Sequence, residues 1–130
     1  MSKKRLAHAA VAISLLAAAS AAEAHHGLTQ QFDVDKQVTL QGVVSKVDWI
    51  NPHIYFVLDV KGATGATDKY LLETVPVAFA RKAGITKAML EGGGKPVEVI
   101  IFPGRKDAHH GFARQVKFSD GRLLQLRGDR

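Results

Sequence analysis

Histidine is the residue type in this sequence with the widest chemical range, and its distribution is uneven. The chain contains six histidines, and all but His8 follow residue 24. Two of the later five are adjacent at the start of that region, one stands alone, and two are adjacent near the end: His25, His26, His53, His109 and His110. Imidazole nitrogen is a common metal ligand, and copper(II) has the highest affinity for nitrogen sites among divalent first-row metals. These five histidines are therefore the candidate metal ligands.

The chemistry of the first pair depends on how the chain is processed. A basic start is followed by an apolar run over residues 6–22 and by Ala22-Glu23-Ala24, which has the small-x-small pattern of a cleavage site. This combination predicts a secretory signal peptide over residues 1–24. Cleavage after Ala24 would leave His25 as the first residue, with its amine and ring able to chelate one ion as a histidine brace.

Other cuts, after Ala21 or Ala22, are also compatible with the pattern. A cut after Ala22 would place His25 third, where the amine, two backbone amides and the imidazole form a square-planar site for copper(II) or nickel(II). The alternative is that His25 and His26 form only a solvated leader that favours export. The expected location is the periplasm, with a mature chain that does not span the membrane, because no second apolar run of such length follows.

Composition limits the mature protein to one small domain. Removing 24 of 130 residues leaves 106, and the formal charge falls from +6 to +4 because Lys3, Lys4, Arg5 and Glu23 are lost. There is no cysteine, so thiolate zinc and iron–sulfur sites are excluded and core packing alone must stabilise the fold. Met89 is the only methionine left, so a methionine-based copper(I) site is not expected. Any copper should be copper(II) on nitrogen ligands.

The hydrophobic pattern predicts an all-β domain with one short helix. A polar N-terminal arm over residues 25–36 should be extended, and the domain should cover residues 37–130. Strand patterns begin at Val38, Ile54, Lys69, Val97, Phe112 and Arg122, with a helical stretch between the third and fourth strands that Thr86 could continue as a second turn. Gly42 suits a bulge or a sharp coil in a long first strand, with Val43 and Val47 on the other face of that strand. Asp120-Gly121 predicts a two-residue hairpin. This order matches a five- to six-stranded Greek-key barrel of the oligonucleotide/oligosaccharide-binding (OB) type, with a generic open sandwich as the alternative.

In such a barrel, the loop joining the first two strands and the loop joining the fourth and fifth frame the ligand-binding region. His53 lies in the first of these loops, and His109 and His110 are expected in the second. Glu73 could orient a ligating histidine. The alternatives are a turn histidine at 53, an exposed polar loop at 109–110 and a surface carboxylate at 73.

Trp49 and Tyr55 flank the first of these loops, where their rings could stack on a ligand. The alternative is that both rings only pack against the protein. Neither serine of the mature chain, Ser45 or Ser119, has a context that suggests an activated nucleophile. No nucleophile elbow, phosphate loop, zinc-protease helix or carboxylate dyad is present.

Several segments resemble those of an exported bacterial protein family, the domain-of-unknown-function family 6152. They are the start Ala24-His25-His26-Gly27, the strand Val38–Val44, Trp49-Ile50-Asn51-Pro52-His53, Leu72-Glu73, the stretch Phe79–Gly84 and Asp120-Gly121-Arg122. Two departures from the family pattern are Gly27, where serine is usual, and the pair His109-His110. The resemblance implies a periplasmic protein and no particular activity.

We therefore expect a small periplasmic binding protein rather than an enzyme. Its leading ligand is copper(II), or another late transition metal, held by the N-terminal and loop histidines. The alternative is a metal-free module that binds a protein, an anionic glycan or a small molecule on the same face. A third hypothesis is an oxidase-like copper enzyme with a histidine brace. Export argues against nucleic acid as the partner, although barrels of this type bind it elsewhere.

Overall fold

The structure, a computed structural model, describes residues 27–126. The chain divides into two units, residues 1–31 and 32–130. Of the first unit only residues 27–31 are described, and they are helical. The extended conformation expected for residues 27–31 is therefore wrong. Their sequence has no period-2 pattern that would favour a strand. No helix in the described part of the chain is long and apolar enough to span a membrane.

The second unit is built mainly of strands. Between residues 32 and 126 they are β1 (Val38–Asp48), β2 (Tyr55–Lys61), β3 (Thr67–Glu73), β4 (Pro96–Pro103), β5 (His110–Phe118) and β6 (Leu123–Gln125). Two short helices, α2 (Val77–Lys82) and α3 (Lys87–Glu91), and the 3-10 turn η1 (Gly92–Gly94) connect β3 to β4. Thr86 caps α3 by accepting a hydrogen bond from the Met89 amide at 3.2 Å, as its sequence position predicted.

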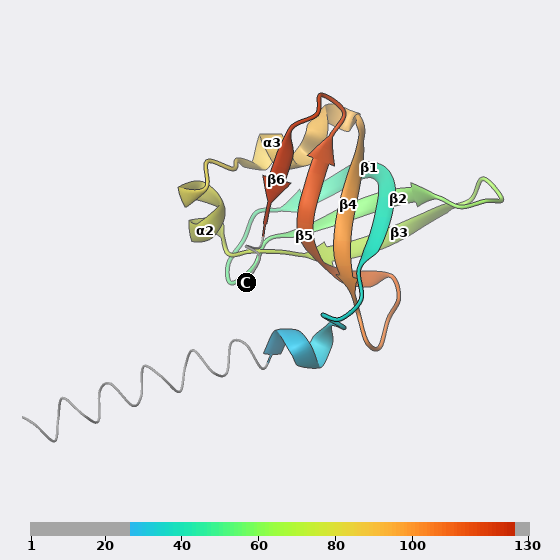
Figure 1. The fold of residues 1–130 in the computed structure, drawn as a ribbon. Coiled ribbons are helices and arrows are strands. Elements are labelled where there is room, and N and C mark those ends of the chain that lie inside the picture. Colours follow the sequence, from blue (N-terminus) through green and yellow to red (C-terminus); the bar gives the residue numbers. More distant parts are fainter. Residues whose placement is uncertain (1–26, 127–130) are drawn as a thin grey trace, which may run out of the picture. The chain divides into compact units, whose positions relative to one another are not determined.

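The sheet closes on itself (Figure 1). Its strand order is β3-β2-β1-β4-β5-β6, with antiparallel neighbours throughout. A parallel pairing of β3 with β5, over Leu71–Glu73 and His110–Phe112, joins the two sides into a five-stranded barrel, and β6 is added to β5. This topology, with its helices between β3 and β4, confirms the predicted OB-like Greek-key barrel.

Alternating apolar residues fill the barrel. Ile54, Phe56 and Leu58 point inward from β2 and the residue before it, and Val97, Val99 and Ile101 do so from β4, as their period-2 patterns predicted. In β1 the buried residues are Leu40, Val44 and Val47, so the expectation that Val47 lies on the opposite face is wrong. The register with β2 shifts between Val44 and Lys46, and this bulge turns the second half of the strand over.

Gly42 does not lie at the bulge, which falls between Val44 and Lys46, and the sharp coil is the alternative that fits. A Cβ at this position would lie 2.3 Å from the carbonyl oxygen of Asp59, so glycine lets β1 and β2 approach closely where the strand coils. The β5–β6 hairpin also differs from expectation. Phe118 and Arg122 are bonded across it, N to O at 2.8 Å, which leaves a three-residue turn that ends at Gly121 with φ 88°.

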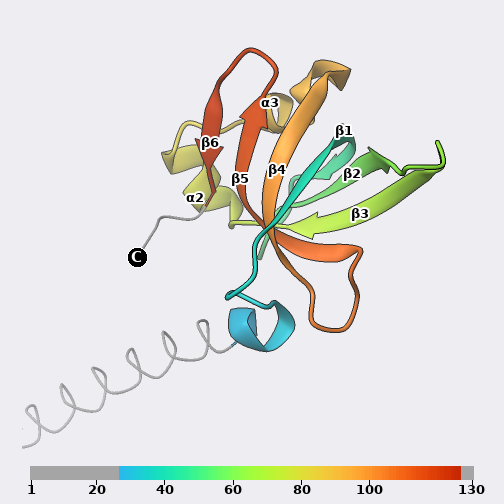
Figure 2. The ribbon, with the colours of Figure 1, turned by 45° about the vertical axis from the view of Figure 1, so that its right-hand side comes forward.

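The two ends of β5 lie at different ends of the barrel. Figures 1 and 2 show the β4–β5 loop at one end of these strands, and the β5–β6 turn with η1 at the other. Nine residues of extended chain separate them in β5, which corresponds to about 26 Å. The candidate functional site lies at the His110 end of β5.

Candidate functional site

Glu73 is the central residue of the candidate site. It is the last residue of β3, where it pairs with Tyr55 of β2 on one side and with Phe112 of β5 on the other. Its position at the closure of the barrel buries it to 7% exposure, so the expectation of a surface carboxylate does not hold. A buried carboxylate is costly unless other groups hydrogen-bond it or balance its charge.

His53 supplies one of these contacts. Its Nδ1 lies 2.5 Å from Oε1 of Glu73. The loop that carries it contains a cis peptide bond between Asn51 and Pro52, and the next residue, Ile54, is bonded through its backbone to Val75 and Thr74. The ring lies with Nδ1 toward the carboxylate, which leaves Nε2 as its other nitrogen.

His110 approaches the same carboxylate from the other side. Its Nε2 lies 3.9 Å from Oε2 of Glu73, which is too long for a hydrogen bond. This nitrogen is buried and has no hydrogen-bond partner among the described residues. His110 is the first residue of β5 rather than part of the preceding loop, because its pairing opposite Leu71 extends the strand beyond the predicted start at Phe112.

Tyr55 completes the surroundings of Glu73. Burial raises the pKa of its hydroxyl, and the negative charge of Glu73 and a hydrogen bond to it raise the pKa further. The hydroxyl therefore stays protonated as a donor to the carboxylate. Tyr55 was a candidate for stacking on a ligand, which remains a prediction, and its hydroxyl interacts with Glu73.

Phe32 is a member of the site that sequence reasoning missed. It is 1% exposed, it forms an isolated bridge with Gly104, and its ring meets that of His110 edge-on with centroids 5.1 Å apart. The ring of Phe112 lies behind it at 5.9 Å. A single aromatic residue in an otherwise polar stretch was the available signal, since such a residue commonly anchors a segment to a core.

The remaining candidates lie elsewhere. The ring of His109 is 4.8 Å from that of Tyr70, and its Nδ1 is 4.0 Å from Asp107, so it does not contact Glu73. Trp49 is partly buried and packs against the core. His25 and His26 lie outside the described residues. The structure thus brings together His53, Glu73 and His110, with Tyr55 beside them.

The cluster is not arranged as a finished metal centre. No group of three or more histidine, aspartate or glutamate side chains between residues 27 and 126 is already disposed around a common point. Oε1 of Glu73 is taken up by His53, while Oε2 faces the unpaired nitrogen of His110. Two electron-rich atoms facing each other repel unless a proton or a metal ion lies between them.

A family model matches residues 10–127, almost the whole sequence. The chain belongs to the DUF6152 family, whose description is a family of unknown function. This confirms the family that the sequence motifs indicated. No curated protein and no solved structure shows a significant match to the chain. For this DUF6152 protein, function must therefore be inferred from the site itself.

Proposed function

We propose that this protein is an exported, non-enzymatic binding protein for a late transition metal ion, with copper(II) as the first candidate. The observation that carries the proposal is the buried Nε2 of His110, which faces Oε2 of Glu73 without a hydrogen bond. A neutral imidazole nitrogen opposite a carboxylate oxygen is the ligand pair that copper(II), nickel(II) and zinc(II) share.

The separation of these two atoms suits an ion between them. Metal–nitrogen and metal–oxygen bonds are each about 2.0 to 2.2 Å long. Their sum slightly exceeds the 3.9 Å that separates Nε2 of His110 from Oε2 of Glu73. An ion that took the two atoms as opposite ligands, as in a square-planar copper(II) site, would need only a small movement of either side chain. A hydrogen bond between them would need the atoms to approach by almost 1 Å.

His53 and Tyr55 would then stabilise the carboxylate ligand. The hydrogen bond from Nδ1 of His53 fixes the orientation of Glu73, and the raised pKa of Tyr55 keeps its hydroxyl available as a donor. Partners of this kind hold a metal ligand in place and tune its affinity. His53 also offers Nε2, and its side chain is 40% exposed, so it can contribute a further nitrogen.

The processed N-terminus offers a second and separate place for copper(II). If cleavage follows Ala24 or Ala22, His25 becomes part of an amine–imidazole chelate, and His26 stands beside it. A retained signal peptide would remove this chelate and would leave the barrel cluster unchanged. Export to the periplasm is part of the proposal and rests on the sequence pattern of residues 1–24.

The test is titration of the exported full-length product with copper(II), nickel(II) and zinc(II) by calorimetry, after mass spectrometry has fixed its first residue. A His25→Ala, His26→Ala background isolates the barrel cluster. In it, His110→Ala and Glu73→Gln should each weaken binding by about tenfold to a hundredfold. His109→Ala is the matched control, because this neighbouring histidine does not reach Glu73.

Unchanged affinity in both His110→Ala and Glu73→Gln would refute the barrel site. Loss of binding in His25→Ala alone would assign the metal to the N-terminus. If neither region binds copper(II) more tightly than micromolar, the metal proposal as a whole is wrong.

The second candidate is a metal-free interaction module that binds a protein, an anionic glycan or a small molecule. The contacts of His53 and Tyr55 with Glu73 favour it, because they satisfy much of the carboxylate without any ion. Under this alternative, neither the wild-type protein nor these variants should bind metal in the titrations. The wild-type protein should instead bind another ligand.

A further inference from the structure

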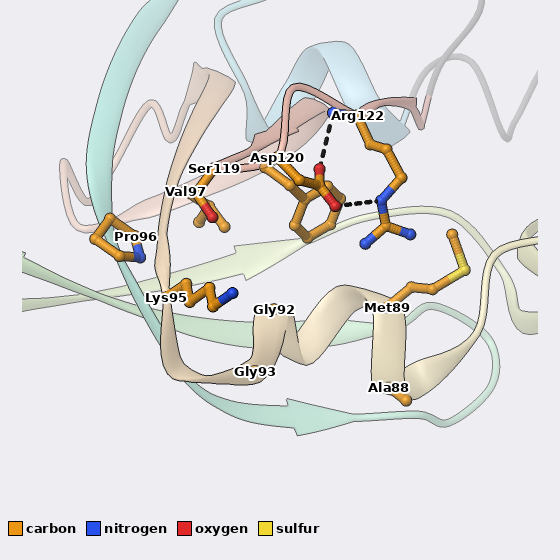
Figure 3. Close-up of a pocket in the computed structure, with 11 residues that line it drawn as sticks. Ala88, Met89, Gly92, Gly93, Lys95, Pro96, Val97, Ser119, Asp120 and Arg122 are labelled. Carbon is orange, nitrogen blue, oxygen red and sulfur yellow. Dashed lines mark hydrogen bonds and ion pairs between the residues drawn. The ribbon is translucent and has the colours of Figure 1, made fainter.

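A pocket of about 220 Å³ lies at the end of β5 opposite the histidine cluster. It is bounded by α3 and η1, by the first residues of β4 and by the β5–β6 turn (Figure 3). Asp120-Gly121 belongs to the predicted hairpin, whereas Gly92-Gly93-Gly94 lies far from it in the sequence. In the folded chain these two segments face each other across the pocket.

Two cationic side chains, those of Lys95 and Arg122, line this pocket. Figure 3 shows Lys95 and Arg122 pointing into the space between Asp120 and the Gly92-Gly93 turn. Asp120 is already engaged, since it accepts hydrogen bonds from the backbone N–H of Arg122 at 2.9 Å and from its Nε at 2.8 Å. Neither Nζ of Lys95 nor the two terminal nitrogens of Arg122 has a hydrogen-bond partner among the described residues.

Two contacts fix the position of the Arg122 guanidinium. It lies over the ring of Phe118 at 5.3 Å and is fixed at Nε by Asp120. This arrangement leaves the two terminal nitrogens, which form the fork that matches a carboxylate. One aspartate and two cations give the pocket a net charge of +1, so a single negative charge would complement it.

The walls between these charges are apolar. Phe118 and Val97 are buried core residues that reach the pocket, and Met89 lines it from α3. Gly92 has φ 68°, and a Cβ there would lie 3.4 Å from Val97 and 3.8 Å from Phe118, so the absence of a side chain keeps this wall open. A volume of about 220 Å³ is larger than an inorganic ion needs and suits a small ring or branched chain.

We infer that this pocket binds a small organic monocarboxylate. Its carboxylate would meet Arg122 and Lys95, and its apolar body would lie against Phe118 and Met89. The inference is independent of the proposed metal site, which lies at the other end of β5. It gives the barrel two binding regions with different chemistry.

Amide NMR spectra of the exported protein titrated with benzoate provide the test. We expect saturable shifts at residues 92–95 and 119–122, with a dissociation constant on the order of 1 mM. Lys95→Gln and Arg122→Gln should each weaken binding by about tenfold. Lys87→Gln is the matched control, because this lysine lies in α3, does not line the pocket and pairs with Glu91.

Two further probes separate charge from shape. Benzamide has the same ring without the charge and should not bind measurably, and inorganic phosphate has charge without an apolar body and should bind more weakly than benzoate. His110→Ala should leave benzoate affinity unchanged. The inference is overturned if benzoate produces no saturable shifts, if both charge variants bind it as well as wild type, or if phosphate binds equally well.

Discussion

The two ends of β5 both carry charged side chains, but they hold them in different ways. At the His110 end, Glu73 is buried between three strands and contacts groups from β2 and β5. At the Phe118 end, Asp120 and Arg122 form an exposed pair on a turn. Because the first set of charges is buried, its contacts contribute to the stability of the fold. The second set is exposed and can replace its contacts with hydrogen bonds to water at little cost.

This difference predicts where function and stability are coupled. Changes around Glu73 should alter both ligand binding and the free energy of unfolding. Changes around Arg122 should alter ligand binding alone.

The two glycine-containing turns should respond unequally to alanine. At Gly104, beside the His110 end, a Cβ would lie 2.6 Å from the carbonyl oxygen of Asp107 and 2.7 Å from that of His110. Gly104→Ala should lower the free energy of unfolding by about 3 kcal/mol, because backbone atoms must move. At Gly93 a Cβ would have no neighbouring atom within 4 Å, but φ is 62°, which disfavours a side chain. Gly93→Ala should therefore lower the free energy of unfolding by only about 1 kcal/mol.

Urea denaturation of both variants measures the contrast. Equal losses would show that the β4–β5 loop is no more tightly packed than η1, and the comparison between the two ends would fail.

A buried hydroxyl near the site should contribute more than an exposed one near the pocket. Thr74 is fully buried and donates a hydrogen bond to the Ala113 carbonyl at 2.9 Å, which links the end of β3 to β5. Thr74→Val should cost about 2 kcal/mol because it removes a hydrogen bond in the core. Thr86→Val, which removes the cap of α3, should cost about 1 kcal/mol.

Thermal and urea unfolding of these two variants should rank them in that order. If Thr86→Val is the more damaging change, the barrel closure beside Glu73 is not the sensitive region that its burial implies.

The sequence was informative about the barrel because barrel positions follow simple periodicity. The inward residues of β2 and β4, the helical segment before β4 and the strand order could all be predicted. The failures were local. The register shift after Val44 moved Val47 inward, and the hairpin gained one turn residue, because bulges and turn lengths depend on pairing with a partner strand that no local pattern reveals.

The candidate site was predicted from residue type together with the expected barrel topology. Placing His53 and the histidines at 109–110 in the two loops that frame an OB-type site predicted that they could converge. Two details depended on tertiary structure. Of the adjacent pair, His110 faces Glu73 because it is the first residue of β5, whereas His109 lies in the preceding loop. Phe32 becomes buried through pairing with Gly104, a residue 72 positions away. Sequence patterns do not encode such long-range pairs.

The alkaline titration of Tyr55 measures how strongly Glu73 is isolated from solvent. The chain has two tyrosines, so a Tyr70→Phe background leaves Tyr55 as the only phenol. Its absorbance midpoint should lie above the ordinary pKa of 10.0, because burial and Glu73 both disfavour the phenolate. Adding Glu73→Gln should lower the midpoint but not restore the ordinary value, since burial is the larger cause.

The raised pKa of Tyr55 also makes the stability of the fold depend on pH. The folded state keeps the Tyr55 proton to a higher pH than the unfolded state does. The stabilisation is therefore complete below pH 10 and is lost as the pH rises through the raised value. A midpoint unaffected by Glu73→Gln would mean that the carboxylate does not interact with Tyr55, and the described cluster would be incorrect.

The smallest effect is expected for Asp120, at the exposed end. The backbone N–H of Arg122, and next its side chain, lower the pKa of this carboxyl below its usual value. The associated stability is present above the unfolded pKa and is lost as the pH falls through the lowered folded value. Arg122→Gln should raise the pKa only part of the way, because the larger contribution, from the backbone, remains.

Carboxyl NMR titration of Asp120 in wild type, Arg122→Gln and Lys87→Gln measures this shift directly. The Lys87 control should match wild type. Because Asp120 is exposed, Arg122→Gln should leave the urea midpoint at neutral pH nearly unchanged while it weakens benzoate binding. A large loss of stability in this variant would show that the β5–β6 turn is coupled to the fold as strongly as Glu73 is, and the proposed division between the two ends would not hold.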